Sequence, residues 1–161
     1  MPKHIWSVLC YKGCLDQFTN QVSLLDVIEI ITIRSKTKPA EPGPHASVPI
    51  KMHLVSLWTR SHPDRAEPVV TRILIQAPDG SKIPGSEVTL ELEKPSLRNF
   101  MSFTTMPFRG PGQYIFVVQY RSEPTEPWQV AVSIPIEVRV EGASDKAPSV
   151  EESSKEETAS R

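Results

Sequence analysis

Cys10 and Cys14 have the clearest capacity for chemistry, because they are the only two cysteines of the chain and lie together in the stretch VLCYKGCLDQF, residues 8–18. A redox centre, a transient disulfide or half of a metal site would each need such a pair. Redox motifs and zinc ribbons place two residues between their cysteines, whereas three stand here, and zinc takes four ligands. We therefore interpret Cys10 as a structural thiol packed at the end of a strand. A redox-active or metal-binding role of Cys10 and Cys14 is the alternative.

The histidines do not complete a metal site with the cysteines. No two of them have a spacing that would let them ligate one ion along a strand or helix; they are His4, His45, His53 and His62. His4 begins an expected strand, His53 lies on an expected exposed face beside Lys51, and the other two stand near prolines in loops. The sequence therefore predicts no metal ligand and no cofactor.

A row of carboxylates is the remaining candidate for acid–base work. Glu87, Glu91 and Glu93 alternate with apolar residues along an expected strand, which is typical of a solvated face that also discourages edge-to-edge pairing. Catalytic carboxylates need burial or a charged partner to shift their pKa values. G-x-S-x-G, P-loop, dinucleotide-binding and H-E-x-x-H patterns are missing from the sequence. We therefore predict no catalytic residue and no enzymatic activity.

The charge balance gives no bulk attraction to nucleic acid or to an anionic membrane. Lysine and arginine number 18 against 19 acidic residues, for a net charge of -1, and a basic nucleic-acid surface would need an excess. The apolar runs fall short of the roughly 20 residues that span a bilayer. The N-terminal apolar stretch is too short for a signal peptide, and Leu9 before Cys10 is too bulky for a cleavage site. We expect a cytoplasmic protein with free thiols.

The elements that must position these residues are strands, because apolar side chains recur with period two. The stretch WQVAVSIPIEVRV, residues 128–140, places seven apolar residues on one face: Trp128, Val130, Val132, Ile134, Ile136, Val138 and Val140. Pro135 predicts an edge or a bulge there. The preceding stretch GPGQYIFVVQYR is its expected hairpin partner, with four residues on one face: Tyr114, Phe116, Val118 and Tyr120.

Further strands are expected at residues 5–11, 22–33, 48–59, 69–77, 87–93 and 99–105, and a helical turn at 14–19 stays open. The 16 prolines and the turn at residues 78–80 fit short strands joined by stiff loops. The sequence predicts an all-β fold, an immunoglobulin-like antiparallel β-sandwich of about eight strands. This domain takes up residues 1–141, and residues 142–161 form a disordered acidic tail rich in serine and glutamate.

Several short motifs resemble those of an uncharacterised bacterial family of small β-sandwich proteins. These are the stretch VLCYKGCLDQFTNQVSLLDVIEII near the N-terminus, a PDG turn at residues 78–80, the G-x-Y of residues 112–114 and the IPIEV of residues 134–138. Asp26 stands where that family often has a small residue. The resemblance implies a β-sandwich over about residues 5–140 and implies no activity.

Because no catalytic or metal-binding residue is predicted, we expect the protein to act by binding through its surface. We predict a non-enzymatic protein-binding or assembly module, because loops and edge strands are what a β-sandwich offers to a partner. The expected partner is another protein, with no nucleic acid and no membrane involved.

Overall fold

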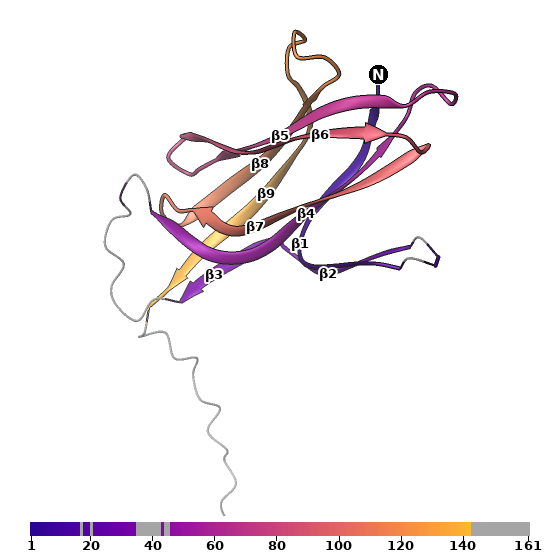
Figure 1. Ribbon diagram of the computed structural model, residues 1–161. Helices are drawn as coiled ribbons and strands as arrows, with labels where there is room; N and C mark the ends of the chain where they lie inside the picture. Colours follow the sequence, from indigo (N-terminus) through magenta and orange to yellow (C-terminus); the bar gives the residue numbers. More distant parts are fainter. Residues whose placement is uncertain (17, 20, 35–42, 44–45, 143–161) are drawn as a thin grey trace, which may run out of the picture.

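The chain folds as a sandwich of two β-sheets in a computed structural model that describes residues 1–16, 18–19, 21–34, 43 and 46–142. Figure 1 shows the two layers packed face to face, with one hairpin projecting away from them. The first sheet has the order β2–β1–β4–β7, and its strands are β1 (Lys3–Leu15), β2 (Val22–Val27), β4 (Ser47–Thr59) and β7 (Ser96–Pro107). The second has the order β3–β9–β8–β5–β6, and its strands are β3 (Ile30–Arg34), β5 (Glu67–Gln76), β6 (Lys82–Leu92), β8 (Gly112–Arg121) and β9 (Gln129–Glu141).

The all-β sandwich of about eight strands predicted from the sequence is confirmed, but one expected strand is divided in two and one pairing is parallel. Residues 22–33 were expected to form one strand; they form β2 in the first sheet and β3 in the second. Asp26 has a φ of 56°, a left-handed conformation that aspartate tolerates, and the Ile28 amide donates to the Leu9 carbonyl over 2.8 Å. The kink returns the chain to the core at Ile28, which is 3% exposed. The described residues therefore give nine strands, and β3 runs parallel to β9 while the other pairs are antiparallel.

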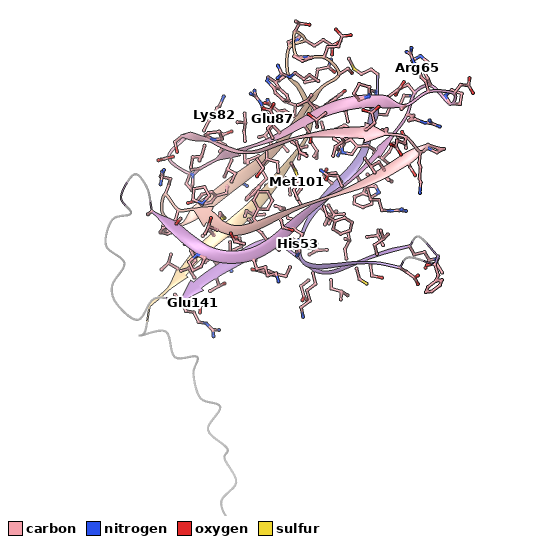
Figure 2. The ribbon with its side chains drawn as sticks, in the orientation of Figure 1. His53, Arg65, Lys82, Glu87, Met101 and Glu141 are labelled. Carbon is pink, nitrogen blue, oxygen red and sulfur yellow. The ribbon has the colours of Figure 1, made fainter. Side chains whose placement is uncertain are left out.

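Alternation along the inner strands builds the core between the sheets. In β5 every second residue is buried, from Glu67 to Ile75. Figure 2 shows the side chain of Met101 between the layers, whereas Lys82 and Glu87 lie on the outside. The largest fully buried side chains include Trp58, Tyr114 and Phe116. Burial of such residues supplies the main driving force for folding.

The closing hairpin has the predicted register over most of its length. Tyr114, Phe116 and Val118 are buried, and β8 is a central strand between β9 and β5. The expected seven-residue face of residues 128–140 is wrong at its start. The register with β8 shifts by one residue at Ala131, so that Ala131 packs against the core and Val130 is 58% exposed. A β-bulge of this kind exchanges the two faces of a strand.

Two turns match their sequence signals. Gly80 has a φ of 82°, and the Ser81 amide donates to the Asp79 carboxylate over 2.9 Å. Before β8, Gly110 has a φ of 102°, and the hydroxyl of Tyr114 donates to the carbonyl of Gly110 over 3.0 Å. The same hydroxyl accepts the Arg109 amide over 2.7 Å, which fixes the entry of the chain into β8.

The first strand is longer than predicted and carries an arm. Residues 14–19 were left open for a helical turn, but β1 continues to Leu15, and residues 10–15 pair with β2. We call this hairpin the arm; it comprises residues 10–15, β2 and the described turn residues 16, 18, 19 and 21. It projects from the sandwich in Figure 1. A Cβ atom at Gly13 would stand 2.7 Å from the Phe100 ring of β7, so the glycine permits the arm to approach the outer face of the first sheet.

One expectation falls outside the described ranges: of the predicted disordered tail, residues 142–161, the structure describes only Gly142. In the described part of the chain, no helix has the length and apolar character needed to cross a membrane.

The fold makes a direct prediction for Phe116→Ala. Phe116 is 0% exposed, and removing a buried aromatic ring costs ~3–5 kcal/mol through lost transfer energy and an unfilled cavity. Urea unfolding should show this loss, whereas Ser133→Val, at an exposed position of β9, should be nearly neutral. A harmless Phe116→Ala would mean that β8 has the opposite register.

Candidate functional site

The two cysteines occupy one strand but do not form a site together. Both lie in β1, four residues apart, and an extended strand rises about 3.3 Å per residue, so roughly 13 Å separates their Cα atoms. A disulfide needs Cα atoms within ~7 Å, and one metal ion could not reach both thiolates. Cys10 is 0% exposed and Cys14 is exposed. Burial raises the pKa of the Cys10 thiol, which keeps it protonated and unreactive. The geometry thus gives no support to the redox or metal alternative.

Of the four histidines, His45 lies outside the described residues, and the other three stand apart from one another. His53 is half-buried, and its Nδ1 lies 2.9 Å from the hydroxyl of Ser102. His4 Nε2 lies 2.7 Å from the Ser7 hydroxyl, which lies 2.7 Å from the hydroxyl of Ser56. Burial lowers the pKa of His4. These hydrogen bonds link His4, Ser7 and Ser56 between the sheets and give each of these polar side chains a partner, as is usual in protein interiors. No group of three histidine, cysteine or acidic side chains within the described residues is placed to hold a metal ion.

A carboxylate that the sequence reading passed over organises one end of the sandwich. Glu67 is 5% exposed and accepts the amides of Ser61 over 2.8 Å and of His62 over 3.1 Å. The ring of His62 also contacts it. The Ser61 amide, followed by the His62 side chain, lowers the pKa of Glu67 from 4.5 to about 2. The group therefore anchors the loop between β4 and β5.

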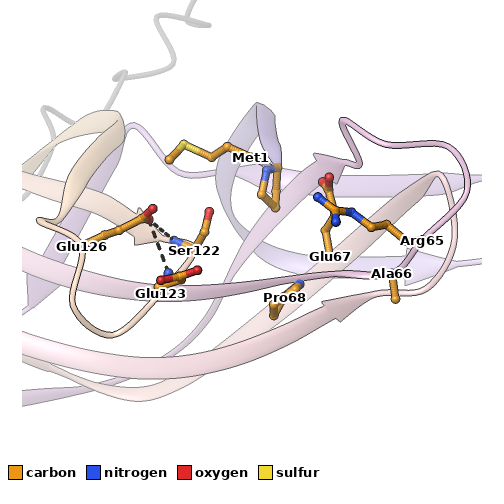
Figure 3. A pocket seen from close by; sticks show the side chains of 9 residues that line it. Met1, Arg65, Ala66, Glu67, Pro68, Ser122, Glu123 and Glu126 are labelled. Carbon is orange, nitrogen blue, oxygen red and sulfur yellow. Dashed lines mark hydrogen bonds between the residues drawn. The ribbon is translucent and has the colours of Figure 1, made fainter.

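Beside Glu67 an open cleft of about 370 Å³ lies between two loops and the start of the chain. In Figure 3 the carboxylate of Glu126 faces the amides of Ser122 and Glu123, which donate to it over 3.0 and 3.4 Å. Met1 lies above the cleft, and its carbonyl accepts the hydroxyl of Ser61. Both carboxylates that organise the loops are thus occupied by backbone amides.

The carboxylate row lies at the edge of the second sheet. Glu87 and Glu91 belong to β6, an edge strand, and Glu93 follows its end. Glu87 lies 3.8 Å from Arg121. Trp128, expected on the buried face, instead lies with its ring centroid 4.0 Å from the guanidinium of Arg72 and 4.2 Å from that of Arg121. These cation–π contacts cover part of the outer face of the sheet.

Several large apolar side chains are exposed and therefore do not contribute to the core. Phe18, at the tip of the arm, is fully exposed, and Leu15, Leu25 and Val27 are exposed along it. Exposed apolar side chains gathered on one element mark interaction sites.

Both residues that sequence reasoning missed carried a local signal. Glu67 begins the alternation Glu67, Val69, Thr71, Ile73 and Ile75, which assigns it to the buried face. Phe18 lies in the stretch DQFTN, two residues after Asp16. The polar residues of this stretch favour a turn, and a turn exposes its side chains.

The comparisons with known proteins give no family. No family model matches the chain, and no curated protein matches it. Among solved structures, one described as the "Structure of the N-terminal domain of PorA" is 12% identical, with 84% of this chain and 97% of that chain covered, at a TM-score of 0.30. A TM-score this low carries no argument about this chain.

A structural role of Cys10 predicts that Cys10→Ser destabilises the protein by ~1–3 kcal/mol, because the change buries a hydroxyl. Cys14→Ser, at an exposed position, should change the stability by less than about 0.5 kcal/mol. Chemical unfolding measures both. Thiol titration of the native protein should label Cys14 well before Cys10, and rapid labelling of Cys10 would contradict its burial.

Glu67 predicts a stability loss at acidic pH. Because its pKa is held near 2 in the folded protein against an ordinary 4.5, its stabilising contribution is complete above pH 4.5 and is lost as the pH falls toward 2. Glu67→Gln should be less stable than the wild type at neutral pH, and the difference should shrink over this pH window. Glu123→Gln, at an exposed position of the same cleft, serves as the control. Parallel pH profiles for wild type and Glu67→Gln would contradict the assignment.

Proposed function

We propose that this chain is a non-enzymatic protein-binding or assembly module that uses the arm as its contact element. The observation that carries the proposal is the set of exposed apolar side chains on a two-stranded hairpin outside the sandwich: Leu25 and Val27 share one face, Leu15 lies on the other, and Phe18 lies in the turn. A hairpin of two strands is only marginally stable by itself, and exposed apolar groups on it add nothing to folding. Burial of these groups against another protein would contribute about 25 cal/mol of favourable free energy for each Å² of apolar area removed from water.

The edges of the arm strengthen the proposal. β2 is the outermost strand of the first sheet, so one side of its backbone faces away from β1. Unpaired N–H and C=O groups at a sheet edge accept an added strand from a partner. The arm therefore combines apolar side chains with backbone hydrogen-bonding groups, which suits recognition of an extended protein segment.

We further infer that the sandwich is of the immunoglobulin-like class and belongs to the bacterial family whose motifs it resembles. Tyr114 stands near the start of β8 and bonds the backbone at Arg109 and Gly110, an arrangement like the tyrosine corner of such sandwiches. The small net charge of -1 favours a protein partner over nucleic acid, and two free thiols suit the cytoplasm.

The proposal is tested by affinity purification of the full chain from its own cells, compared with the double variant Leu25→Ser, Val27→Ser. Both positions are exposed, so the variant should keep its melting temperature. A partner should be recovered with the wild type and lost with the variant, and the purified partner should then show weakened binding to the variant in titration.

Ser133→Asn is the matched control, because Ser133 is exposed on β9, away from the arm. It should retain the partner. Equal recovery of every bound protein by the wild type and the double variant would sink the proposal that the arm is the contact element.

A further inference from the structure

The exposed large hydrophobic side chains gather in two places. In the part of the chain that the structure describes they number eight. Four lie on the arm and Ile30 follows at the start of β3, whereas Met1, Ile5 and Val130 lie around a separate hollow. A protein with scattered surface apolar residues needs no explanation, but two separate clusters point to two binding surfaces.

The hollow lies where β1 and β9 meet at one side of the sandwich. It is open, with a volume of about 370 Å³, and its lining includes Lys3, His4, Ile5, Tyr120, Val130 and Ala131. β1 pairs with β2 only from residue 10 onward, and β9 pairs with β3 only over residues 137–141. The parts of both strands that border the hollow therefore lie beyond the ends of these pairings.

Two irregularities form the walls of the hollow. The register of β1 shifts between His4 and Trp6, which leaves Ile5 exposed, and the bulge of β9 at Ala131 leaves Val130 exposed. Each bulge turns an aliphatic side chain outward toward the same hollow. Behind it, the half-buried ring of Tyr120 packs edge-on against Trp58, with ring centroids 5.4 Å apart. The result is an open depression that has Tyr120 at its back and is lined by aliphatic side chains of both strands together with the polar side chains of Lys3 and His4.

The tip of the arm has complementary chemistry. Phe18 is fully exposed there, and Asp16 accepts its amide over 2.8 Å. The amides of Thr19 and Phe18 lower the pKa of Asp16, which keeps the exposed carboxylate ionised. An aromatic ring with an anion beside it thus faces outward on the arm, while the hollow offers the side chains of Ile5, Tyr120 and Val130 with the cationic Lys3 in its lining.

We propose that the arm of one chain inserts Phe18 into this hollow on a second copy, with Asp16 placed beside Lys3. The inference rests on the proposed function and names the partner as a second copy of the chain. The inserting and receiving surfaces are different parts of the molecule, so a single insertion leaves an arm free on one copy and a hollow free on the other. Identical chains therefore join head to tail.

Two variants that each remove one half of the contact test this. Phe18→Ser removes the inserting ring, and Val130→Asp places a charge in the hollow. By light scattering behind a sizing column, the wild type should grow in mass with concentration, and each variant alone should stay monomeric. A mixture of the two variants should restore one contact, between the arm of Val130→Asp and the hollow of Phe18→Ser, and give dimers but nothing larger.

Matched controls are Thr19→Ser beside Phe18 and Ser133→Asp, which adds the same charge elsewhere on β9; both should assemble like the wild type. Melting curves verify that every variant folds. A monomeric wild type at all concentrations, or a mixture that stays monomeric, would overturn the inference. If a different protein still binds the wild type through the arm, the proposed function survives that outcome; if no protein does, both fail.

Discussion

The chain crosses from one sheet to the other between Val27 and Ile30, and the pairing at this side of the sandwich depends on that crossing. The left-handed conformation of Asp26 and the hydrogen bond from Ile28 to Leu9 end β2 and deliver β3 to the second sheet. β3 then covers only the last part of β9, and β2 covers only the last part of β1. One local constraint on the backbone thereby decides which strand edges have neighbours.

The arm follows from the same crossing. Because β1 continues beyond the point where the chain turns back toward the core, residues 10–15 and β2 pair with each other outside the sandwich. Gly13 lets this hairpin approach Phe100 closely, and Cys10 at its root is buried on the outer face of the first sheet, apart from the main core. Its thiol therefore belongs to the packing of the arm, which explains why a cysteine pair in the sequence does not become a chemical centre.

Hydrogen bonds from polar side chains hold two connecting segments in place, the loop between β4 and β5 and the residues before β8. Glu67 and Arg60 hold the loop between β4 and β5, with Arg60 donating to three backbone carbonyls, those of Pro63, Arg65 and Glu93. Tyr114 fixes the chain before β8. Since Glu67, the terminal nitrogens of Arg60 and the Tyr114 hydroxyl all bond to backbone groups, these residues act on the shape of the loops. The exposed apolar residues are what remain available to a partner.

The sequence alone determined which side chains of the regular strands are buried. Alternation is a local property, so it correctly placed Tyr114, Phe116 and Val118 in the core and the glutamates of β6 on an exposed edge. Tertiary structure decided which sheet each strand joins, the parallel pairing of β3 with β9 and the bulge that exposes Val130. These depend on partners distant along the chain, and a one-residue shift in pairing reverses a face without changing the sequence pattern. For the same reason the hollow, formed by residues 1–5, 120 and 130–131, had no signal in any single stretch.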